Sequence, residues 1–530
     1  MNWIKAYDVV LTWMLKNIFE GMNIDLKGLA KVKEYADRGP LILVPCHKSH
    51  LDYLILSYVF HHNQMPCPHI AAGKNLSFWP LGTIFRGGGA FFIRRTFKGA
   101  KLYSEIFSAY MQQLIKEGFN IEFFIEGGRS RSGKLLTPKF GILAQIVEAF
   151  RKSSQEDLII VPIFIGYDRV LEEKSYLKEL SGGEKDPENM SGLIKARRFL
   201  NKKYGKVYVN FNNPISLKDY SEKALQSGLS KKNMIEKLGL NIIDDISKVS
   251  IITPYSIVSS ALLNSRKNAI SHEKLKKIID TYINYLKLIK APFSDTLITN
   301  PETSIDVVFE TFESRGFISK DQTSGLLSIY ESKRAVLDYY KNNSIAFFTS
   351  AAYTAISIME MEAFQFSASD LHISFDRYQQ MFAKDFIPDQ TNPPDFIVRK
   401  TLKAFIEEAI IIPHETLPDT YKITGEGYKK LKSFASFLLP YLEAYWVASS
   451  FFMKYPSEDI DLKDASKKVL SLGNRMYKRG EIRFNESLSK INLKNGMDYL
   501  SSKGIKGNED RNEVINFMKS LEFSIASIME

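Results

Sequence analysis

The feature that most restricts the fold is an alternation of short apolar segments and helical segments between residues 40 and 218. The apolar segments are bounded by Gly, Pro or charged residues, which is typical of strands; they cover 41–45, 91–93, 121–125, 158–165 and 207–211. Helical spacing falls between them at 52–62, 100–117 and 141–152. Because alternating strands and helices form a sheet with helices packed on it, we predict an α/β fold for 40–218.

The pattern changes on both sides of this region. After Asn213-Pro214 strand-like runs nearly disappear, and helical spacing dominates at 231–249, 273–288, 400–412 and 464–487. The first forty residues are also helical in pattern and end at the turn signal Arg38-Gly39-Pro40. We therefore predict three parts: a helical N-terminal arm (1–39), an α/β domain (40–218) and a large all-α C-terminal domain (219–530). No internal repeat is evident in the sequence.

The N-terminal segment has the pattern of an amphipathic helix. Its apolar face contains Trp3, Tyr7, Val10, Leu11, Met14 and Ile18. Such a helix packs on the protein's own core or lies in a lipid interface, and Trp and Tyr favour the interface. It does not resemble a secretory signal peptide, because Asp8 precedes a short apolar run with no small-residue cleavage site after it.

Two later segments approach the length of a membrane span. Residues 342–359 carry no charge but are rich in Asn, Ser and Thr, and residues 433–453 contain Pro440 and Glu443. A spanning helix needs about 20 predominantly apolar residues and seldom holds a central carboxylate. We expect both segments to be buried or interfacial helices that do not cross a membrane.

The charge balance favours an anionic partner. The chain has 71 Lys and Arg against 60 Asp and Glu, which suits nucleic acid, an anionic membrane surface or a phosphorylated small molecule. The segment from Arg86 to Lys139 contains ten basic and four acidic residues. A basic loop cluster on an α/β scaffold favours a small anion, and no recognised nucleic-acid motif accompanies it, so we expect no nucleic-acid partner. The presence of only two cysteines excludes a disulfide scaffold and favours a reducing compartment.

The strongest candidate for catalysis is the pair His47 and Asp52, which follows the strand at 41–45 at a strand-to-helix transition. An Asp at a helix start can reach back to the imidazole and fix its tautomer. The other ring nitrogen is then free to take a proton from a hydroxyl group. In this arrangement the substrate's hydroxyl would replace the serine of a catalytic triad. The alternative is that Asp52 only caps a helix.

A metal site is the rival explanation for the histidines. Five of the eight histidines lie between His47 and His69, and both cysteines, Cys46 and Cys67, lie in or next to this segment. Their spacing matches no usual zinc pattern. We therefore expect no metal and no cofactor.

Three further segments suit an anion or the edge of a site. The strand at 91–93 ends in Arg94 and Arg95, whose paired guanidinium groups could bind a phosphate or form an ordinary ion pair. The loop Glu126-Gly127-Gly128-Arg129-Ser130-Arg131-Ser132-Gly133-Lys134 offers close backbone approach and several donors, but Leu135 breaks the P-loop pattern. Pro162 predicts a sheet edge, a bulge or a strand end for 158–165, with or without a functional role.

Four blocks in this order resemble the glycerol-3-phosphate 1-O-acyltransferase family of the bacterial PlsB type. They are V-P-C-H-K-S-H-L-D-Y-L-I-L-S-Y at 44–58, G-G-A-F-F-I-R-R-T-F at 88–97, F-F-I-E-G-G-R-S-R-S-G-K at 123–134 and I-V-P-I at 160–163. The resemblance implies an acyltransferase-like α/β domain. It implies His47 as general base and Asp52 as its orienting partner, and Pro162 on the acyl-donor side. It assigns to the glycerol 3-phosphate site the residues Arg94, Arg95, Glu126, Gly127, Ser130 and Arg131.

The resemblance also implies a reaction and its partners. An acyl chain would pass from an acyl-CoA or acyl-ACP (acyl carrier protein) thioester to the sn-1 hydroxyl of glycerol 3-phosphate, giving 1-acylglycerol 3-phosphate for phospholipid biosynthesis. The expected location is peripheral, on an anionic membrane surface at the cytoplasmic face of the bacterial inner membrane. A dihydroxyacetone-phosphate acyltransferase and a non-catalytic phospholipid-binding protein remain the alternatives.

Overall fold

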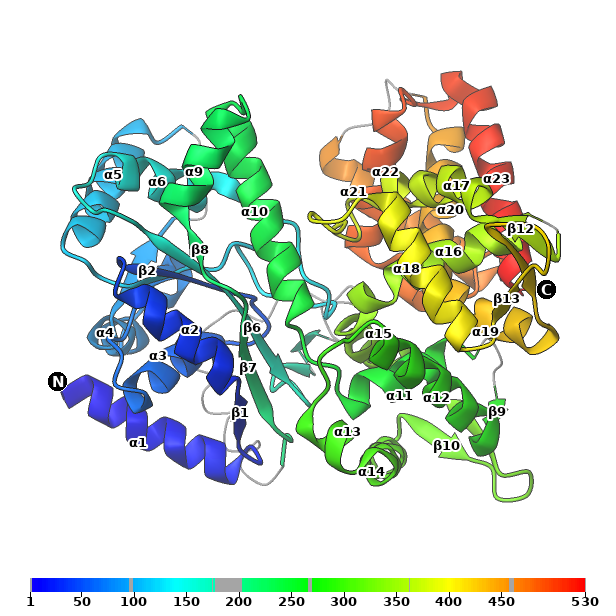
Figure 1. The fold of residues 1–530 in the computed structure, drawn as a ribbon, viewed down its shortest axis with the longest axis horizontal. Helices are drawn as coiled ribbons and strands as arrows, with labels where there is room; N and C mark the ends of the chain where they lie inside the picture. Colours follow the sequence, from blue (N-terminus) through cyan, green and yellow to red (C-terminus); the bar gives the residue numbers. More distant parts are fainter. Residues whose placement is uncertain are drawn as a thin grey trace. The chain divides into compact units, whose positions relative to one another are not determined.

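The computed structural model describes residues 2–94, 99–173, 175–176, 203–265, 269–361, 363–456 and 462–529 (Figure 1). The chain forms two compact units. Unit 1 contains Met1–Arg131 and Leu135–Ile251, and unit 2 contains Ser132–Lys134 and Ile252–Glu530. The expected part boundaries at residues 39 and 218 both fall inside unit 1.

Unit 1 is built on an eight-stranded sheet in the order β1-β7-β6-β2-β5-β3-β4, with β8 paired to β6. The strands are β1 (Met22–Ile24), β2 (Leu41–Pro45), β3 (His69–Gly73), β4 (Ala90–Ile93), β5 (Ile121–Glu122), β6 (Ile159–Tyr167), β7 (Val207–Phe211) and β8 (Ile215–Ser216). The five strands from β6 to β4 in this order are all parallel, while β7 and β8 run antiparallel to β6. Parallel strands end at one edge of the sheet, so loops that follow them meet there.

Helices pack on this sheet. They are α1 (Asn2–Asn17), α2 (Leu26–Ala36), α3 (Asp52–His62), α4 (Leu81–Gly87), α5 (Lys101–Lys116), α6 (Phe140–Arg151), α9 (Leu217–Gln226) and α10 (Lys231–Lys248), with the 3-10 turn η1 (Lys74–Leu76). One core joins α1, α2 and α3 to alternate residues of β2, β6 and β7, among them Leu41, Leu43 and Val161. Helix α10 packs against β6 and α6, which is why it belongs to unit 1.

The predicted α/β class is confirmed, and so are most of its elements. The strands at 41–45 and 207–211 and the helix at 52–62 have the predicted bounds. The first forty residues are not continuous helix, because β1 separates α1 from α2. Strand β3 was not predicted, since its Ala71, Ala72 and Gly73 have low strand propensity.

Pro162 lies inside the sheet, not at an edge. Strand β6 is flanked by β2 on one side and by β7 and β8 on the other, and Pro162 is paired with Val44 in register with β2. The Pro162 carbonyl accepts from the Asn212 N–H at 3.0 Å. Its missing N–H therefore faces the side of β7 and β8, in the gap between Ile160, paired with β8, and Ile163, paired with β7. Between these two pairs, residues 161–162 of β6 face residues 212–214, so the register shifts by one residue, as in the bulge that the sequence allowed for Pro162.

Unit 2 is predominantly helical, as predicted, and it also contains two small three-stranded sheets. Its helices are α11 (Pro254–Leu263), α12 (His272–Leu288), α13 (Asp295–Thr299), α14 (Pro301–Ser314), α15 (Arg334–Asn342), α16 (Thr349–Met359), α17 (Ala368–Met381), α18 (Pro394–Glu407), α19 (Gly425–Ala435), α20 (Leu439–Lys454), α21 (Leu462–Lys478), α22 (Lys490–Ser502) and α23 (Arg511–Met529). Its strands are β9 (Ala269–Ser271), β10 (Ile318–Lys320), β11 (Leu326–Ile329), β12 (Gln365–Ser367), β13 (Ile411–Pro413) and β14 (Thr420–Ile423).

A similar order of six elements occurs twice in unit 2, although no internal repeat is evident in the sequence. The first stretch runs α11, β9, α12, α14, β10, β11, with the short helix α13 inserted between α12 and α14, and the second runs α16, β12, α17, α18, β13, β14. The two antiparallel sheets have the same strand order, β10-β11-β9 and β13-β14-β12.

In both stretches the helix before the second strand ends in the same way, a helix end that α3, α5 and α12 also have. The Phe317 N–H donates to the Phe312 carbonyl at 2.7 Å, and the Ile410 N–H donates to the Phe405 carbonyl at 2.8 Å, in each case just after a residue with positive φ. Matching buried positions hold residues of different type, such as Ile279 in α12 and Phe375 in α17. The repeat preserves apolar character more than residue identity, which hides it in the sequence.

Both candidate membrane segments are buried, as expected. They form α16 and the stretch from α19 into α20, and the carboxylate of Glu443 is nearly enclosed in α20. It accepts hydrogen bonds from the N–H groups of Arg483 and Phe484 and from the Ser487 hydroxyl. Among the helices that the structure describes, none combines the length and apolar character needed to cross a bilayer. The stretch 181–191, which the sequence suggests is a surface excursion, lies outside the described residues.

Candidate active site

His47 and Asp52 are in direct contact at the carboxyl end of β2. The Asp52 Oδ2 atom lies 3.0 Å from His47 Nδ1, and both side chains are buried. Asp52 is the first residue of α3, and the five residues between Cys46 and α3 turn the chain so that this carboxylate faces back toward the imidazole. The contact predicted from the five-residue spacing is therefore present.

Asp52 is held by more than the imidazole. Its Oδ2 also accepts from the N–H groups of Lys48 (2.6 Å) and Ser49 (2.8 Å), and its Oδ1 accepts from the Tyr167 hydroxyl at 2.5 Å. Both carboxylate oxygens therefore act as hydrogen-bond acceptors. Because an ionised carboxylate only accepts, His47 Nδ1 carries the proton in this contact, and Nε2 keeps its lone pair.

The second ring nitrogen of His47 faces an aromatic cluster. Nε2 lies 3.0 Å from the Tyr53 hydroxyl, which donates to it in this tautomer. The imidazole stacks on the Phe124 ring at 4.0 Å between centroids, and Tyr53 meets the same ring edge-on. Phe124 therefore packs on one face of the imidazole, and Asp52 and Tyr53 contact its two nitrogens.

The loop after β5 is tied to His47 by Glu126. One carboxylate oxygen accepts from the His47 N–H and the other from the Leu136 N–H, each at 2.8 Å. The Ser130 N–H in turn donates to the His47 carbonyl at 2.8 Å. Burial raises the pKa of Glu126 to about 7, opposed by these N–H donors and by Lys48. Glu126 therefore acts as a clamp between the histidine segment and both ends of the loop.

Four of the remaining predicted residues, Arg94, Gly127, Ser130 and Arg131, follow parallel strands at the same edge of the sheet. Arg94 is exposed at the end of β4, where its guanidinium lies over the Tyr103 ring at 4.8 Å. Gly127 is exposed with φ at +65°, Ser130 is buried and Arg131 is half-buried. Arg95 lies outside the described residues. Pro162 is buried within β6, beside Val44 of β2.

Several residues at this edge were not predicted. Glu172 accepts from the His50 N–H at 2.8 Å and from the Ser49 hydroxyl, and it forms an ion pair with Arg129. The Tyr176 hydroxyl donates to the Lys48 carbonyl at 2.8 Å. The contacts with Lys48, Ser49 and His50 join residues more than 120 positions apart, and the Arg129 contact also spans separate elements, so no local sequence pattern could reveal them.

Glu122 is a further buried acid next to the site. It is completely buried in β5, and within the described part of the chain its carboxyl oxygens have no hydrogen-bond partner. Burial and the nearby Asp52 carboxylate raise the pKa of Glu122 well above its usual value. Burial therefore favours the protonated, neutral form of Glu122.

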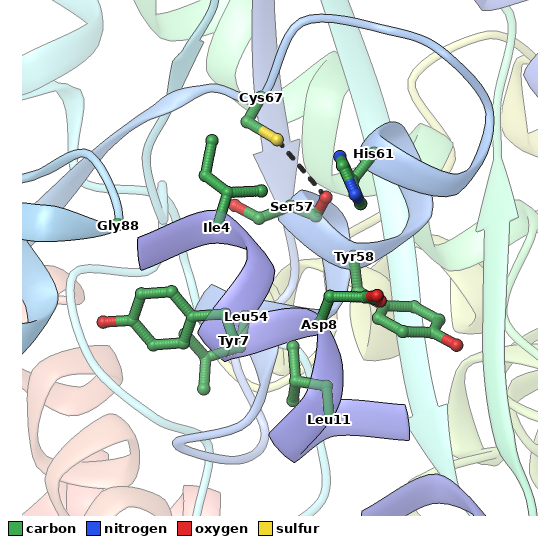
Figure 2. Close-up of a pocket in the computed structure, with 10 residues that line it drawn as sticks. All are labelled: Ile4, Tyr7, Asp8, Leu11, Leu54, Ser57, Tyr58, His61, Cys67 and Gly88. Carbon is green, nitrogen blue, oxygen red and sulfur yellow. Dashed lines mark hydrogen bonds between the residues drawn. The ribbon is translucent and has the colours of Figure 1, made fainter. Parts of the chain in front are cut away.

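A separate pocket lies between α1 and α3 (Figure 2). Its walls are largely apolar and include Ile4, Tyr7, Leu11 and Leu54. None of the predicted site residues lines it. His61 and Cys67 border it, and the Cys67 thiol contacts the Ser57 carbonyl.

The histidines and cysteines are not grouped as a metal site where the structure describes them. His61 and His62 are exposed at the end of α3, and His62 contacts Asp8. Both cysteines are free. Within the described ranges, no three His, Cys, Asp or Glu side chains are arranged to bind a metal ion.

Comparison with known proteins agrees with this geometry. A family model described as Acyltransferase matches residues 23–166, and one described as Glycerol-3-phosphate acyltransferase C-terminal region matches residues 176–509. The first contains the His47–Asp52 pair and the Glu126 loop; the second contains nearly all of unit 2. The fold and the matched models define the chain as an acyltransferase-type α/β protein with a large helical region.

Curated relatives narrow the class. The glycerol-3-phosphate acyltransferase of Histophilus somni is 33% identical over 469 residues, covering 86% of this chain and 56% of the relative. The glycerol-3-phosphate acyltransferase of Haemophilus influenzae is 36% identical over 375 residues, covering 68% of this chain and 46% of the relative. The chain belongs to the glycerol-3-phosphate acyltransferase family, and it spans about half the length of these curated relatives. The solved PlsC 1-acyl-sn-glycerophosphate acyltransferase from Thermotoga maritima overlaps 45% of this chain and 75% of its own, at 16% identity and a TM-score of 0.28, too low to support a comparison.

Proposed function

We propose that the protein transfers an acyl chain from a thioester to the sn-1 hydroxyl of glycerol 3-phosphate, giving 1-acylglycerol 3-phosphate. The observation that carries the proposal is the buried His47–Asp52 contact at the carboxyl edge of the parallel strands. A fixed, oriented base suits hydroxyl activation, and family membership supports the choice of acceptor.

His47 is the general base in this proposal. Its Nε2 takes the proton of the acceptor hydroxyl while that oxygen attacks the thioester carbonyl carbon. Collapse of the tetrahedral intermediate breaks the C–S bond, and the imidazolium returns the proton to the leaving thiolate. Asp52 keeps Nδ1 protonated and stabilises the imidazolium, as the aspartate of a catalytic triad does.

The acceptor hydroxyl would take the place of the Tyr53 hydroxyl at Nε2. The phosphate would bind the donors at the same edge of the sheet, contributed by Arg94, Arg95, Ser130 and Arg131, with Gly127 allowing close backbone approach. Glu126 would keep these donors in register with His47 through its two backbone hydrogen bonds. Binding the phosphate would therefore also place the hydroxyl against the base.

The donor would be acyl-CoA or acyl-ACP, with Pro162 on the side of the acyl donor. A thioester is already activated, so the proposed chemistry requires neither a covalent acyl-enzyme nor a metal or organic cofactor. Both donors present the same phosphopantetheine thioester, and the experiment below distinguishes them.

We further propose a peripheral position on the cytoplasmic face of the bacterial inner membrane. The exposed apolar residues Trp3, Val9, Val10 and Trp13 fall within about a third of the circumference of α1. A helix side with exposed tryptophans suits a lipid interface, and the basic balance of the chain suits anionic headgroups. The opposite side of α1 is buried at Leu11, so both roles considered for this helix are compatible.

The test is acyl transfer by the purified 530-residue chain with anionic vesicles and each acceptor and donor in turn. The proposal predicts labelled 1-acylglycerol 3-phosphate from glycerol 3-phosphate, and the faster donor identifies the physiological class. Faster acylation of dihydroxyacetone phosphate would favour that acceptor instead. Lipid binding by folded protein without product from any pair would favour the non-catalytic alternative.

A further inference from the structure

The tip of the loop that carries Ser130 and Arg131 belongs to unit 2. Ser132–Lys134 is part of that unit, although the residues on both sides, Arg131 and Leu135, are part of unit 1. All three tip residues are buried. The chain therefore leaves unit 1 at the proposed phosphate loop, contributes three residues to the helical unit and returns.

The backbone of this tip is fixed within unit 2. The Asn342 side-chain amide donates to the Ser132 carbonyl at 2.9 Å. Gly133 has a φ of +85°, and a Cβ there would overlap the Tyr339 carbonyl oxygen. Only glycine fits this left-handed and closely packed position.

The side chain of Lys134 occupies a site built for a cation. Its Nζ lies 3.7 Å from the Asp385 carboxylate and 3.3 Å from the Asn492 side-chain oxygen. The same ammonium lies over the Tyr441 ring at 4.4 Å and the Phe386 ring at 5.2 Å from the centroids. A buried ammonium needs this kind of compensation, because burial disfavours its charged form.

Asp385 is itself held in place. Its carboxylate accepts from the Tyr445 hydroxyl at 2.8 Å and from the Asn495 amide at 2.9 Å. Asp385 lies in the segment that connects α17 to α18, and it is almost fully buried. The partner of Lys134 is therefore preorganised, which makes the pair a fixed point for the loop.

We propose that Lys134 is a positioning residue, and that its pairing with Asp385 sets where Ser130 and Arg131 stand to bind the phosphate of the acceptor. Lys134 follows Arg131 by three residues, and a residue spans at most about 3.6 Å of extended chain. Releasing Lys134 removes the side-chain anchor of the tip, so the segment that carries the phosphate donors is held less firmly, although the backbone hydrogen bonds of Ser130 and Ser132 remain. The inference rests on the proposed function. It adds to the acceptor site a distant residue, Asp385, which lies about 250 positions after Lys134 and influences acceptor affinity through it.

Two substitutions test the pair, Lys134→Met and Asp385→Asn. Each should raise the KM for glycerol 3-phosphate at least ten-fold and change kcat less than three-fold, because His47 and Asp52 are untouched. The double variant should be no worse than the more affected single variant, since the pair acts as one unit. Lys134→Arg, which keeps the charge, should recover part of the affinity.

Matched controls come from an exposed ion pair in the same unit. Lys384 lies next to Asp385 in sequence and pairs with Asp498 at 2.9 Å with both side chains partly exposed. Lys384→Met and Asp498→Asn should leave the KM unchanged. Tyr445→Phe, which removes one donor to Asp385, provides a milder variant with a smaller rise in KM should Asp385→Asn fail to fold.

Hydrogen exchange over residues 127–136 separates this inference from the proposed function. Faster exchange in Lys134→Met and Asp385→Asn than in the two controls supports the anchor even if no acyl transfer is found. Unchanged KM together with unchanged loop exchange in both variants would overturn it.

Discussion

Replacing Asp52 by Asn tests how much the carboxylate contributes to the base. The amide oxygen can keep the geometry of Oδ2, but it carries no charge to stabilise the imidazolium of His47. General base catalysis contributes about 10²–10⁴-fold, or about 3–5 kcal/mol of barrier. We expect kcat to fall within this range, while the KM for glycerol 3-phosphate changes little because Asp52 does not face the proposed phosphate donors.

The same substitution also lowers stability. Three donors share Oδ2 in the native protein, those of His47, Lys48 and Ser49. A hydrogen bond to a charged acceptor contributes about 1 kcal/mol more than one to a neutral acceptor, so unfolding should become easier by roughly 2–4 kcal/mol. Urea unfolding measures this loss independently of activity.

Asp168→Asn is the matched control. Asp168 is also a buried carboxylate of unit 1, and it likewise accepts from a backbone N–H, that of Lys206, and from a tyrosine hydroxyl, that of Tyr208. It should lose comparable stability and retain its kcat. Initial rates of labelled product formation at saturating substrate compare the two variants, and equal kcat values for both would refute the role assigned to Asp52.

Four further variants test other parts of the account. Glu122→Gln should flatten the pH dependence of stability. Because the pKa of Glu122 is raised in the native protein, the native state holds a proton that the unfolded chain releases, so the wild-type unfolding free energy falls as pH rises above the usual pKa of a glutamic acid. Equal slopes in urea unfolding for both proteins would contradict this. Tyr53→Phe removes the hydroxyl that the acceptor displaces, and since a neutral hydrogen bond contributes about 0.5–1.5 kcal/mol, the KM for glycerol 3-phosphate should fall about two- to ten-fold; a higher KM would mean that the hydroxyl assists binding. Gly133→Ala should cost about 1–3 kcal/mol in thermal unfolding because of its positive φ, and an unchanged melting temperature would show that the tip can rearrange. Arg94→Ala should raise the KM for glycerol 3-phosphate at least ten-fold at nearly constant kcat, and an unchanged KM would remove Arg94 from the phosphate site.

The parts of the site that were predictable from sequence are local. His47 and Asp52 are five residues apart at a strand-to-helix junction, and the turn between the strand and α3 brings the carboxylate at the first helical position back to the ring. Likewise, the carboxyl ends of parallel strands share an edge, which places Arg94 and the Glu126 loop near one another once the strands are recognised.

The parts that were not predictable depend on distant residues. Tyr167 reaches Asp52 from 115 positions along the chain, and Lys134 reaches Asp385 from about 250. For Pro162 the sequence allowed a sheet edge, a bulge or a strand end, and only the pairing of β6 with both β7 and β8 shows that this proline lies at a register shift inside the sheet. The repeat in unit 2 stayed hidden because packing requires only that matching positions be apolar.

The most direct test of the central claim is single-turnover acyl transfer by His47→Ala beside the wild-type chain, with glycerol 3-phosphate binding measured for both. The account predicts labelled 1-acylglycerol 3-phosphate from wild type, a loss of at least about 100-fold in the variant, and similar binding by both proteins. Transfer by His47→Ala at a rate near that of wild type would contradict the account.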